Sequence, residues 1–279
     1  MLHFQFIENE TFQTLPEEMF HGESNRKPDY PIEASGKMTW SVRSLLARIG
    51  GRTFLVDTGF GTKLPENIQR AYTLKRHIDS IHYPSNKTFS DSITDVLLTH
   101  LHLDHAGGNT FIGTNGEILP SFPMARYWCS REQYEYALSP EQADRDSYFP
   151  NDFEALRSMN RLFFLEEGFS AEGIRWESFI GHSPGMVMYY FEGAKDRLCF
   201  AGDLLPSAAH CDVNLGMIYD FDREQALKEK ETLLEQLAAT GSWVALQHDA
   251  YRLFGQIDKK KDEFIWRENP SFLAQKILR

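Results

Sequence analysis

The run THLHLDHAGG occupies residues 99–108 and decides how the rest of the chain is interpreted. It follows directly on ITDVLL (93–98), a short apolar segment with the composition of a mostly buried strand. His100 and His102 are two positions apart, so in extended backbone both imidazoles face the same side. Two ring nitrogens placed in this way can bind one metal ion. The run therefore predicts a metal site at the end of a buried strand.

Asp104 and His105 add a carboxylate and a third imidazole directly behind the first two histidines. Gly107 and Gly108 follow and allow the chain to turn sharply, so this second pair can face the same cavity from another angle. Imidazole and carboxylate ligands together suit zinc, and also manganese, iron or cobalt. A polar surface loop is the alternative interpretation. Three histidines and an aspartate within six residues disfavour it.

Three further candidates for metal ligands lie at or near the ends of expected strands. His182 lies in the turn GHSPG, Asp203 follows an apolar run, and His248 ends the run SWVALQ. Taken alone, a histidine or aspartate in such a place is more often structural. The three share one kind of position, however, and strand ends can converge on one rim. We therefore expect them to join the 99–108 run around one site.

The order of apolar and turn-forming segments predicts a mixed fold without repeats or linkers. A hairpin is expected at 41–56, turning at Gly50-Gly51, and its second strand ends in Asp57-Thr58-Gly59. Further strands are expected at 93–98, 126–129, 174–180, 186–192, 197–202 and 242–247, and a long loop at 16–36. Helices are expected at 62–82, 131–138, 152–163 and 223–239. Ser130 and Asp222 are the expected caps of the second and the last, and the last carries Ala226, Leu233, Leu234 and Leu237 on one stripe. Two sheets packed face to face with helices outside would satisfy this order, and an open doubly wound sheet is the alternative. We expect residues 1–279 to form a single domain.

The composition favours a globular protein that acts on a small molecule. The 279 residues include 40 acidic and 29 basic side chains, which gives a formal net charge of −11. Nucleic-acid and membrane partners are disfavoured, because both kinds of binding need a basic surface. The first residues do not have the pattern of a secretory signal, and three cysteines fit no disulfide framework. We expect a cytoplasmic protein whose oligomeric state stays open, a homodimer included.

The motifs in their order resemble those of the metallo-β-lactamase superfamily. The run 99–108 is accompanied by LVDTG upstream and by GHSPG, AGD and a late histidine downstream. The resemblance implies an α+β fold, a four-layered αββα sandwich with the site at one edge of its two sheets. It also implies a pair of metal ions and a role for each motif residue. By this match His100, His102 and His182 would bind the first ion, Asp104, His105 and His248 the second, Asp203 would bridge both, and Asp57 would support the ligands.

Within the superfamily the chain is most similar to the branch of quorum-quenching lactonases and methyl parathion hydrolase-like enzymes. The runs GDLLPSAAH (202–210) and QHDAY (247–251) carry this likeness, together with the N-terminal loop. Two positions depart from it. Met186 replaces a histidine that binds no metal, and Pro206 stands where some acyl-homoserine lactonases have a tyrosine, so a tyrosine-assisted mechanism is not carried over. The candidates for a substrate pocket are Phe20, His210 and Tyr251.

These residues imply a hydrolase that uses two divalent ions, with zinc as the first choice. A hydroxide bridging the ions would be the nucleophile, because a bound metal lowers the pKa of water from about 16 to about 7. Asp104 or Asp203 would pass a proton to the leaving oxygen. The expected substrate is a small ester-like molecule, with a lactone of the N-acyl-homoserine type as the best choice. Hydrolysis of a phosphotriester, an aryl ester or a thioester, the last as in glyoxalase II, is the alternative.

Other classes of protein fit the sequence less well. An iron-dependent redox or sulfur enzyme is allowed by the ligand types, but the chain is too short to carry an added flavodoxin domain. A nuclease is disfavoured by the acidic composition and by the lack of a large inserted domain. A non-catalytic binding module is disfavoured because the ligand set is intact.

Overall fold

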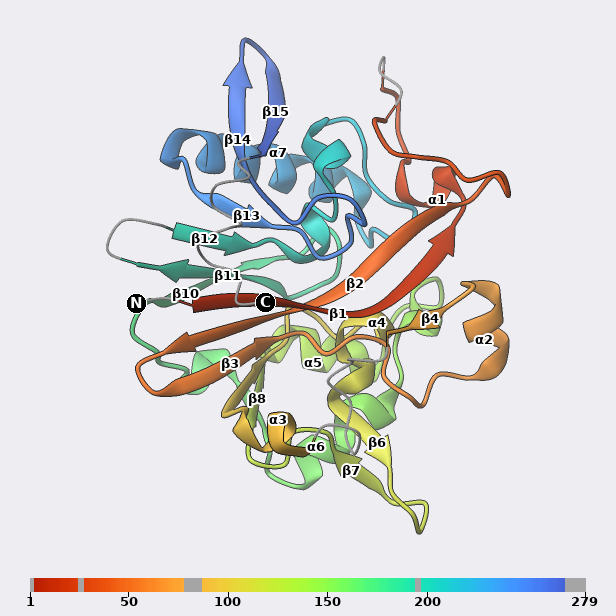
Figure 1. Cartoon of the computed structure of the whole chain (residues 1–279), viewed down its shortest axis with the longest axis vertical. Coiled ribbons are helices and arrows are strands. Elements are labelled where there is room, and N and C mark those ends of the chain that lie inside the picture. Colours follow the sequence, from red (N-terminus) through yellow and green to blue (C-terminus); the bar gives the residue numbers. More distant parts are fainter. Residues whose placement is uncertain (1–2, 25–27, 78–86, 194–196, 269–279) are drawn as a thin grey trace. The chain divides into compact units, whose positions relative to one another are not determined.

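The computed structural model describes residues 3–24, 28–77, 87–193 and 197–268. The chain forms two compact units (Figure 1). Unit 1 contains residues 3–11 and the described part of 42–172, and unit 2 contains the described parts of 12–41 and 173–268. The single-domain organisation expected from the sequence stays a prediction. Among the described residues, no helix is both long enough and apolar enough to cross a membrane.

The first large sheet, most of whose residues belong to unit 1, places two of the sequence motifs side by side. Its order among the described residues is β4-β1-β2-β3-β5-β8-β9. The strands are β1 (His3–Thr14), β2 (Met38–Ile49), β3 (Arg52–Val56), β4 (Lys75–Arg76), β5 (Asp95–Leu97), β8 (Arg126–Cys129) and β9 (Leu162–Phe164). β3, β5, β8 and β9 run parallel, whereas β2 and β3 form the antiparallel hairpin that the sequence predicts. Because β3 and β5 are parallel neighbours, the segments that follow them leave the same edge of the sheet.

Two helices of unit 1 contribute buried apolar side chains to a core with this sheet. Leu55 of β3, Val96 of β5 and Tyr127 of β8 share one core with Ala137 and Leu156 of the helices. The described α-helices of unit 1 are short. They are α2 (Glu66–Ala71), α3 (Lys87–Ser92), α4 (Leu103–Ala106), α5 (Arg131–Leu138) and α6 (Glu154–Ser158). A small hairpin of β6 (Thr110–Ile112) and β7 (Ile118–Pro120) follows α4. The Ser130 hydroxyl accepts a hydrogen bond from the amide of Gln133 at 3.0 Å and caps α5, as the sequence predicts.

Unit 2 contains a second large sheet, with the order β10-β11-β12-β13-β14-β15. Its strands are β10 (Ile174–Phe179), β11 (Met186–Glu192), β12 (Arg197–Phe200), β13 (Trp243–Ala245), β14 (Phe254–Lys260) and β15 (Glu263–Glu268). Only β12 and β13 pair in parallel within this sheet of described strands. The residues that follow these two strands therefore leave the sheet at one edge, next to each other.

The long helix α7 (Arg223–Thr240) packs on the sheet of unit 2 beside β14, and Figure 1 shows it in light blue. Asp222 caps it by accepting a hydrogen bond from the amide of Gln225 at 3.0 Å. Its buried side carries Ala226, Leu233, Leu234 and Leu237, the stripe that the sequence predicts, and also Lys230. The short helices α1 (Pro16–Met19), η5 (Gly202–Leu204) and η6 (Ala208–Cys211) complete the unit.

Several elements differ from the sequence-based expectations. The helix expected at 152–163 is shorter than predicted, because α6 covers only Glu154–Ser158 and residues 162–164 form strand β9, which pairs with β8. The helix expected at 62–82 shrinks to α2, and its residues 78–82 lie outside the described part of the chain. The loop expected at 16–36 contains α1. Strand β1 and the hairpin β14–β15 were not predicted, since their alternation of apolar and polar residues is broken by charged side chains.

Candidate metal centre and its surroundings

The first two histidines of the 99–108 run lie together in unit 1, directly after β5. Nε2 of His100 lies 3.0 Å from Nδ1 of His102, and both side chains are buried. His102 has extended backbone and stands at the N-cap of α4, so the chain enters a helix only after both imidazoles are placed. The two imidazoles thus lie next to each other after a buried strand, as the sequence predicts.

The one-turn helix α4 places the next two candidates. Asp104 lies in its first turn and His105 in its last, with Oδ1 of Asp104 3.6 Å from Nε2 of His105. A ring nitrogen of His105 also lies within 4.8 Å of one of His100. Three imidazoles and a carboxylate of unit 1 therefore gather in one place. This donor set suits a divalent cation, and an uncompensated group of this kind is costly to bury.

Gly107 is needed for a reason other than the sharp turn expected from the sequence. Its φ of −57° is ordinary for any residue. The turn after β3 packs so closely on it that an added Cβ would lie 2.3 Å from the carbonyl oxygen of Phe60. Gly61 is placed in the same way, because its Cβ would lie 2.4 Å from the carbonyl oxygen of Gly107. The glycines let the segments after β3 and β5 lie against each other.

Asp57 follows β3 directly and is hydrogen-bonded to residues of the 99–108 run. It is fully buried and accepts hydrogen bonds from the amide of Thr99 at 2.8 Å and from the Thr99 hydroxyl at 2.8 Å. Its Oδ2 also lies 2.9 Å from Nδ1 of His105. A carboxylate at Nδ1 holds the proton on that nitrogen and leaves Nε2 of His105 with its lone pair free for a cation. Asp57 adopts this position with a φ of 55°, which is unusual for a residue other than glycine.

The three downstream candidates lie together in unit 2, with the two histidines next to the carboxylate of Asp203. Asp203 follows β12 in η5, and His248 follows the neighbouring strand β13. Oδ1 of Asp203 lies 3.0 Å from Nε2 of His248, and Oδ2 lies 3.5 Å from Nε2 of His182. All three side chains are buried. Each oxygen of Asp203 thus faces a different histidine, as a carboxylate must if it is to serve two neighbouring cations.

The sequence did not identify the groups that orient these two histidines. Nδ1 of His182 lies 3.0 Å from Oδ1 of Asp220, and Nδ1 of His248 donates to the backbone carbonyl of Ser41 at 2.8 Å. Both rings therefore turn Nε2 toward Asp203. Asp220 lies in an irregular segment rather than at a strand end, so no pattern marked it. In unit 1, Asp144 is a second unpredicted neighbour, with Oδ1 3.5 Å from Nε2 of His102.

Asp249, next to His248, is a structural acid rather than a solvated one. It is fully buried and accepts hydrogen bonds from the amides of Tyr251 at 2.9 Å, Arg252 at 3.0 Å and Ala208 at 3.0 Å. The last of these bonds begins η6. Asp249 therefore ties the turn after His248 to the segment that follows Asp203.

The three candidates for a substrate pocket have different surroundings within unit 2. His210 is buried, with Nδ1 2.8 Å from the Ser207 hydroxyl and Nε2 2.8 Å from the carbonyl of Met19. Burial, and then the charge of Lys230, lower the pKa of His210 to about 3, so its ring is neutral. Phe20 lies on that ring with a centroid distance of 5.0 Å. Tyr251 is 52% exposed, and its ring meets Tyr30 at 5.2 Å.

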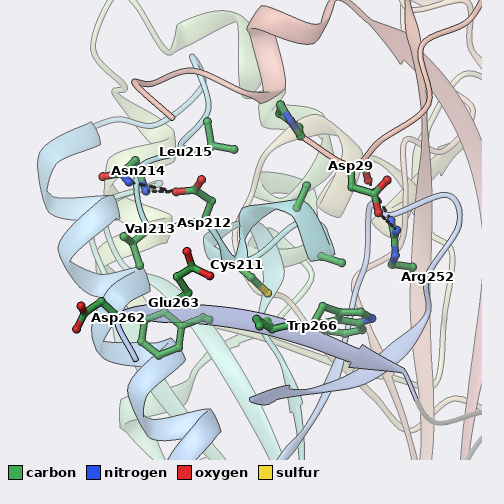
Figure 2. A pocket seen from close by; sticks show the side chains of 15 residues that line it. Asp29, Cys211, Asp212, Val213, Asn214, Leu215, Arg252, Asp262, Glu263 and Trp266 are labelled. Carbon is green, nitrogen blue, oxygen red and sulfur yellow. Dashed lines mark hydrogen bonds and ion pairs between the residues drawn. The ribbon is translucent and has the colours of Figure 1, made fainter. Parts of the chain in front are cut away.

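A cavity of unit 2 with a volume of about 430 Å³ is a separate feature, which Figure 2 shows. Its wall includes Cys211 at the end of η6, Asp212 directly after it, Trp266 of β15, and Arg252, which pairs with Asp29 at 2.8 Å. His182, Asp203 and His248 do not line it. This cavity therefore does not belong to the group of candidate ligands around Asp203.

Known structures share the fold of this chain. A probable metal-dependent hydrolase from Staphylococcus aureus is 21% identical, with a TM-score of 0.80 over 96% of this chain and 98% of that one. AidC, a dizinc quorum-quenching lactonase in complex with a product, is 19% identical, with a TM-score of 0.73 over 96% and 94%. An N-acyl homoserine lactone hydrolase with its product at the catalytic metal centre is 19% identical, with a TM-score of 0.65 over 90% and 93%. At these identities the likeness is one of fold.

The sequence itself matches a family description. No curated protein matches the chain. The model of the metallo-beta-lactamase superfamily matches residues 39–248, which include Asp57 and all seven candidate ligands. Together with the two large sheets, this match confirms the predicted superfamily and the α+β fold class. The chain belongs to the metallo-beta-lactamase superfamily and is a metal-dependent hydrolytic enzyme of that fold.

Proposed function

We propose that the two groups of side chains form one dinuclear centre, with zinc as the metal, that hydrolyses a lactone of the N-acyl-homoserine type. The observation that carries the proposal is the position of Asp203. Its two oxygens face Nε2 of His248 at 3.0 Å and Nε2 of His182 at 3.5 Å. Two histidines placed on the two oxygens of one carboxylate are the arrangement that a shared ligand requires.

The ligand assignment follows the pairs found in each unit. His100 and His102 would bind the first ion with His182, and Asp104 and His105 would bind the second with His248. Asp203 would bridge the ions. The proposal is supported by the close approach of His100 to His102 and of Asp104 to His105. The family match, which includes all seven of these residues, also supports it.

The donor types favour zinc, and the protein supplies the geometry. When bound, two divalent ions would provide a hydroxide at neutral pH and polarise the carbonyl of the substrate. Asp57 would keep the proton of His105 on Nδ1, and Asp220 would do the same for His182. Asp104 or Asp203 would hold the proton that the leaving oxygen receives. The carboxylates of Asp104 and Asp203 would also balance two of the positive charges of the ions.

A lactone substrate is favoured by two kinds of likeness. The runs 202–210 and 247–251 resemble those of the lactonase branch. AidC, which shares the fold, is described as a dizinc lactonase in complex with N-hexnoyl-L-homoserine. The aromatic side chains of Phe20 and Tyr251, with His210, would line the path of an apolar acyl chain. They lie in unit 2, the unit that contains His182, Asp203 and His248.

We further propose that the enzyme acts in the cytoplasm on a small molecule and binds neither nucleic acid nor membranes. The acidic net charge of −11 supports this. All three cysteines are free and buried, which suits a reducing compartment.

The test is elemental analysis combined with hydrolysis assays on the same preparation. We expect two zinc ions per chain and cleavage of an N-acyl-homoserine lactone faster than of an aryl ester, a phosphotriester or a thioester. Dialysis against a chelator should abolish the cleavage and added zinc should restore it. A preparation with two ions that opens no lactone but cleaves one of the other three esters would reject the lactone and keep the hydrolase. Iron with oxygen consumption would reject both.

A further inference from the structure

Lys230 is a buried cation in a place where the helix pattern calls for an apolar side chain. It lies on the same side of α7 as Ala226, Leu233 and Leu237, and it is 2% exposed. Burying an ammonium group costs several kcal/mol unless its protons are paired, so a methionine or leucine would stabilise the helix packing more simply. The presence of a lysine therefore needs a local reason.

The amine of Lys230 holds the backbone of an irregular segment. It donates one hydrogen bond to the carbonyl of Asp212 at 2.9 Å and another, very short one to the carbonyl of Leu215. Neither carbonyl belongs to a helix or strand. The carbonyl of Asp212 also accepts a hydrogen bond from the amide of Leu215 at 3.2 Å, so the amine closes a turn that the backbone has begun. Lys230 thus fixes the beginning of the segment 212–222, which contains Asp220.

The same segment is attached to His182 at its other end. The amide of Met217 donates to Oδ2 of Asp220 at 2.8 Å, which leaves Oδ1 on Nδ1 of His182 at 3.0 Å. The amide of Phe221 donates to the carbonyl of His182 at 3.0 Å. Between these ends, Gly216 exchanges two backbone hydrogen bonds with His21, at 2.8 and 3.0 Å. Lys230 and His182 therefore lie at opposite ends of one tied segment.

Lys230 and Asp220 also face each other across a small space. Both line a cavity of about 10 Å³, whose wall includes Asp203 and His210. The charges of Asp220 and Asp212 favour the ammonium form, whereas burial and Arg223 oppose it, and the pKa of Lys230 is lowered to about 8. At neutral pH a cation therefore stands behind the carboxylate that orients His182.

We propose that Lys230 is a positioning residue of the metal centre, which holds the segment 212–222 so that Asp220 keeps Nε2 of His182 directed at Asp203. This inference rests on the proposed dinuclear centre. A lysine that only satisfied two carbonyls would affect folding stability, but it would not affect one metal ion more than the other. The inference therefore concerns metal affinity, which is measured without any substrate.

The experiment is a double-mutant cycle on zinc affinity. Lys230→Met, Asp220→Asn, the combined variant and the wild type are titrated with zinc against a chromophoric chelator at pH 7, with circular dichroism as a check of folding. We expect Lys230→Met and Asp220→Asn each to lower the affinity for one of the two zinc ions by about 10- to 100-fold. This is the usual effect of removing a group that orients a ligand. The combined variant should bind zinc no more weakly than the weaker-binding single variant, because both substitutions act through His182. Lys228→Met is the matched control, since Lys228 lies on the exposed side of α7 and pairs with Glu224.

Three results would overturn the inference or its basis, and they are distinguishable. A folded Lys230→Met variant with two zinc ions bound as in the wild type overturns the role of Lys230 alone, and so do effects that add in the combined variant. A wild-type protein that binds no zinc overturns the proposed function itself. If Lys230→Met does not fold, hydrogen exchange of the Met217 and Phe221 amides in the wild type decides. Zinc should slow both amides, and exchange that zinc leaves unchanged rejects the coupling.

Discussion

Oδ1 of Asp203 lies 3.0 Å from Nε2 of His248, although 44 residues and the whole of α7 separate them in the chain. The pairing arises because β12 and β13 are parallel neighbours, so both residues leave the sheet at the same edge. In the proposed centre both groups would turn their lone pairs to a cation.

Asp203→Asn should remove activity almost completely. The amide keeps the size of the side chain but loses the charge and one acceptor, so it cannot serve two cations. We expect kcat/KM to fall by about a thousandfold, because several kcal/mol of charge stabilisation at the reacting oxygen are lost. Zinc content and hydrolysis are measured on the same sample. Asp262→Asn, in the exposed turn between β14 and β15, is the control and should behave as wild type. An Asp203→Asn variant that retains both ions and full activity would contradict the bridging role.

Asp57→Ala should weaken zinc binding and stability together. The variant removes the acceptor at Nδ1 of His105, which should lower affinity by about 10- to 100-fold. It also leaves the buried amide of Thr99 without its partner, which should cost about 1–3 kcal/mol of the free energy of unfolding. Zinc competition and urea unfolding measure the two effects. Thr53→Ser, on the same strand but away from the run 99–108, should change neither.

Asp249→Ala should destabilise unit 2 without removing any ligand. Three backbone amides lose their acceptor, those of Ala208, Tyr251 and Arg252. We expect a loss of about 2–4 kcal/mol in the free energy of unfolding, less than three separate bonds would give, because the two exposed-side amides can turn to water. Metal content at low temperature should stay at the wild-type level. Loss of metal from a fully folded variant would show that Asp249 does more than fix the turn.

The buried pair of Lys63 and Asp152 predicts a pH dependence of stability. Nζ of Lys63 lies 2.9 Å from Oδ1 of Asp152, and burial raises the pKa of Asp152 from 3.8 to about 6 in spite of this partner. A carboxyl group whose pKa is raised by folding contributes its full stability below pH 3.8, and that contribution is lost as the pH rises through about 6. The wild type should therefore lose at most about 3 kcal/mol relative to Asp152→Asn between pH 4 and pH 7.

Urea unfolding of the two proteins across that range measures the difference in slope. Lys63 also donates to the carbonyls of Gly107 and Thr110, so it keeps two hydrogen-bond acceptors in the Asp152→Asn variant. Asp146→Asn, at an exposed position of the same region, should leave the slope unchanged. Parallel pH profiles for the wild type and Asp152→Asn would rule out titration of Asp152 in this range.

The parts of the fold that follow from local pattern could be predicted from the sequence. The helices α5 and α7 were found with their caps, Ser130 and Asp222, because a capping side chain lies within three residues of the amide that it binds. The strand β11 was predicted with its observed bounds, since its apolar run is long and uninterrupted. The seven candidate ligands and Asp57 were named from motif and strand-end positions, and within each unit they lie together.

The remainder depends on contacts between distant segments. Strand β9 (Leu162–Phe164) is set by pairing with β8, and its sequence continues an apparent helix pattern. Asp220 and Asp144 reach His182 and His102 from irregular segments whose path no periodicity defines. Lys230 stands in an apolar stripe, where a sequence pattern treats a charge as an interruption. Such residues become visible only when their partners are placed in space.

The parallel strand pairs β3–β5 and β12–β13 have a consequence for engineering. Asp57, His100, Asp203 and His248 follow strands whose register is set by ladders of backbone hydrogen bonds, so their places are insensitive to what the intervening loops contain. The loop between β1 and β2, residues 15–37, bears none of the proposed ligands. The proposed ligands and the proposed pocket residue Phe20 therefore stand on separable parts of the polypeptide. Grafting that loop from another member of the superfamily, with the backbone pairing of His21 and Gly216 retained, offers a route to new specificity.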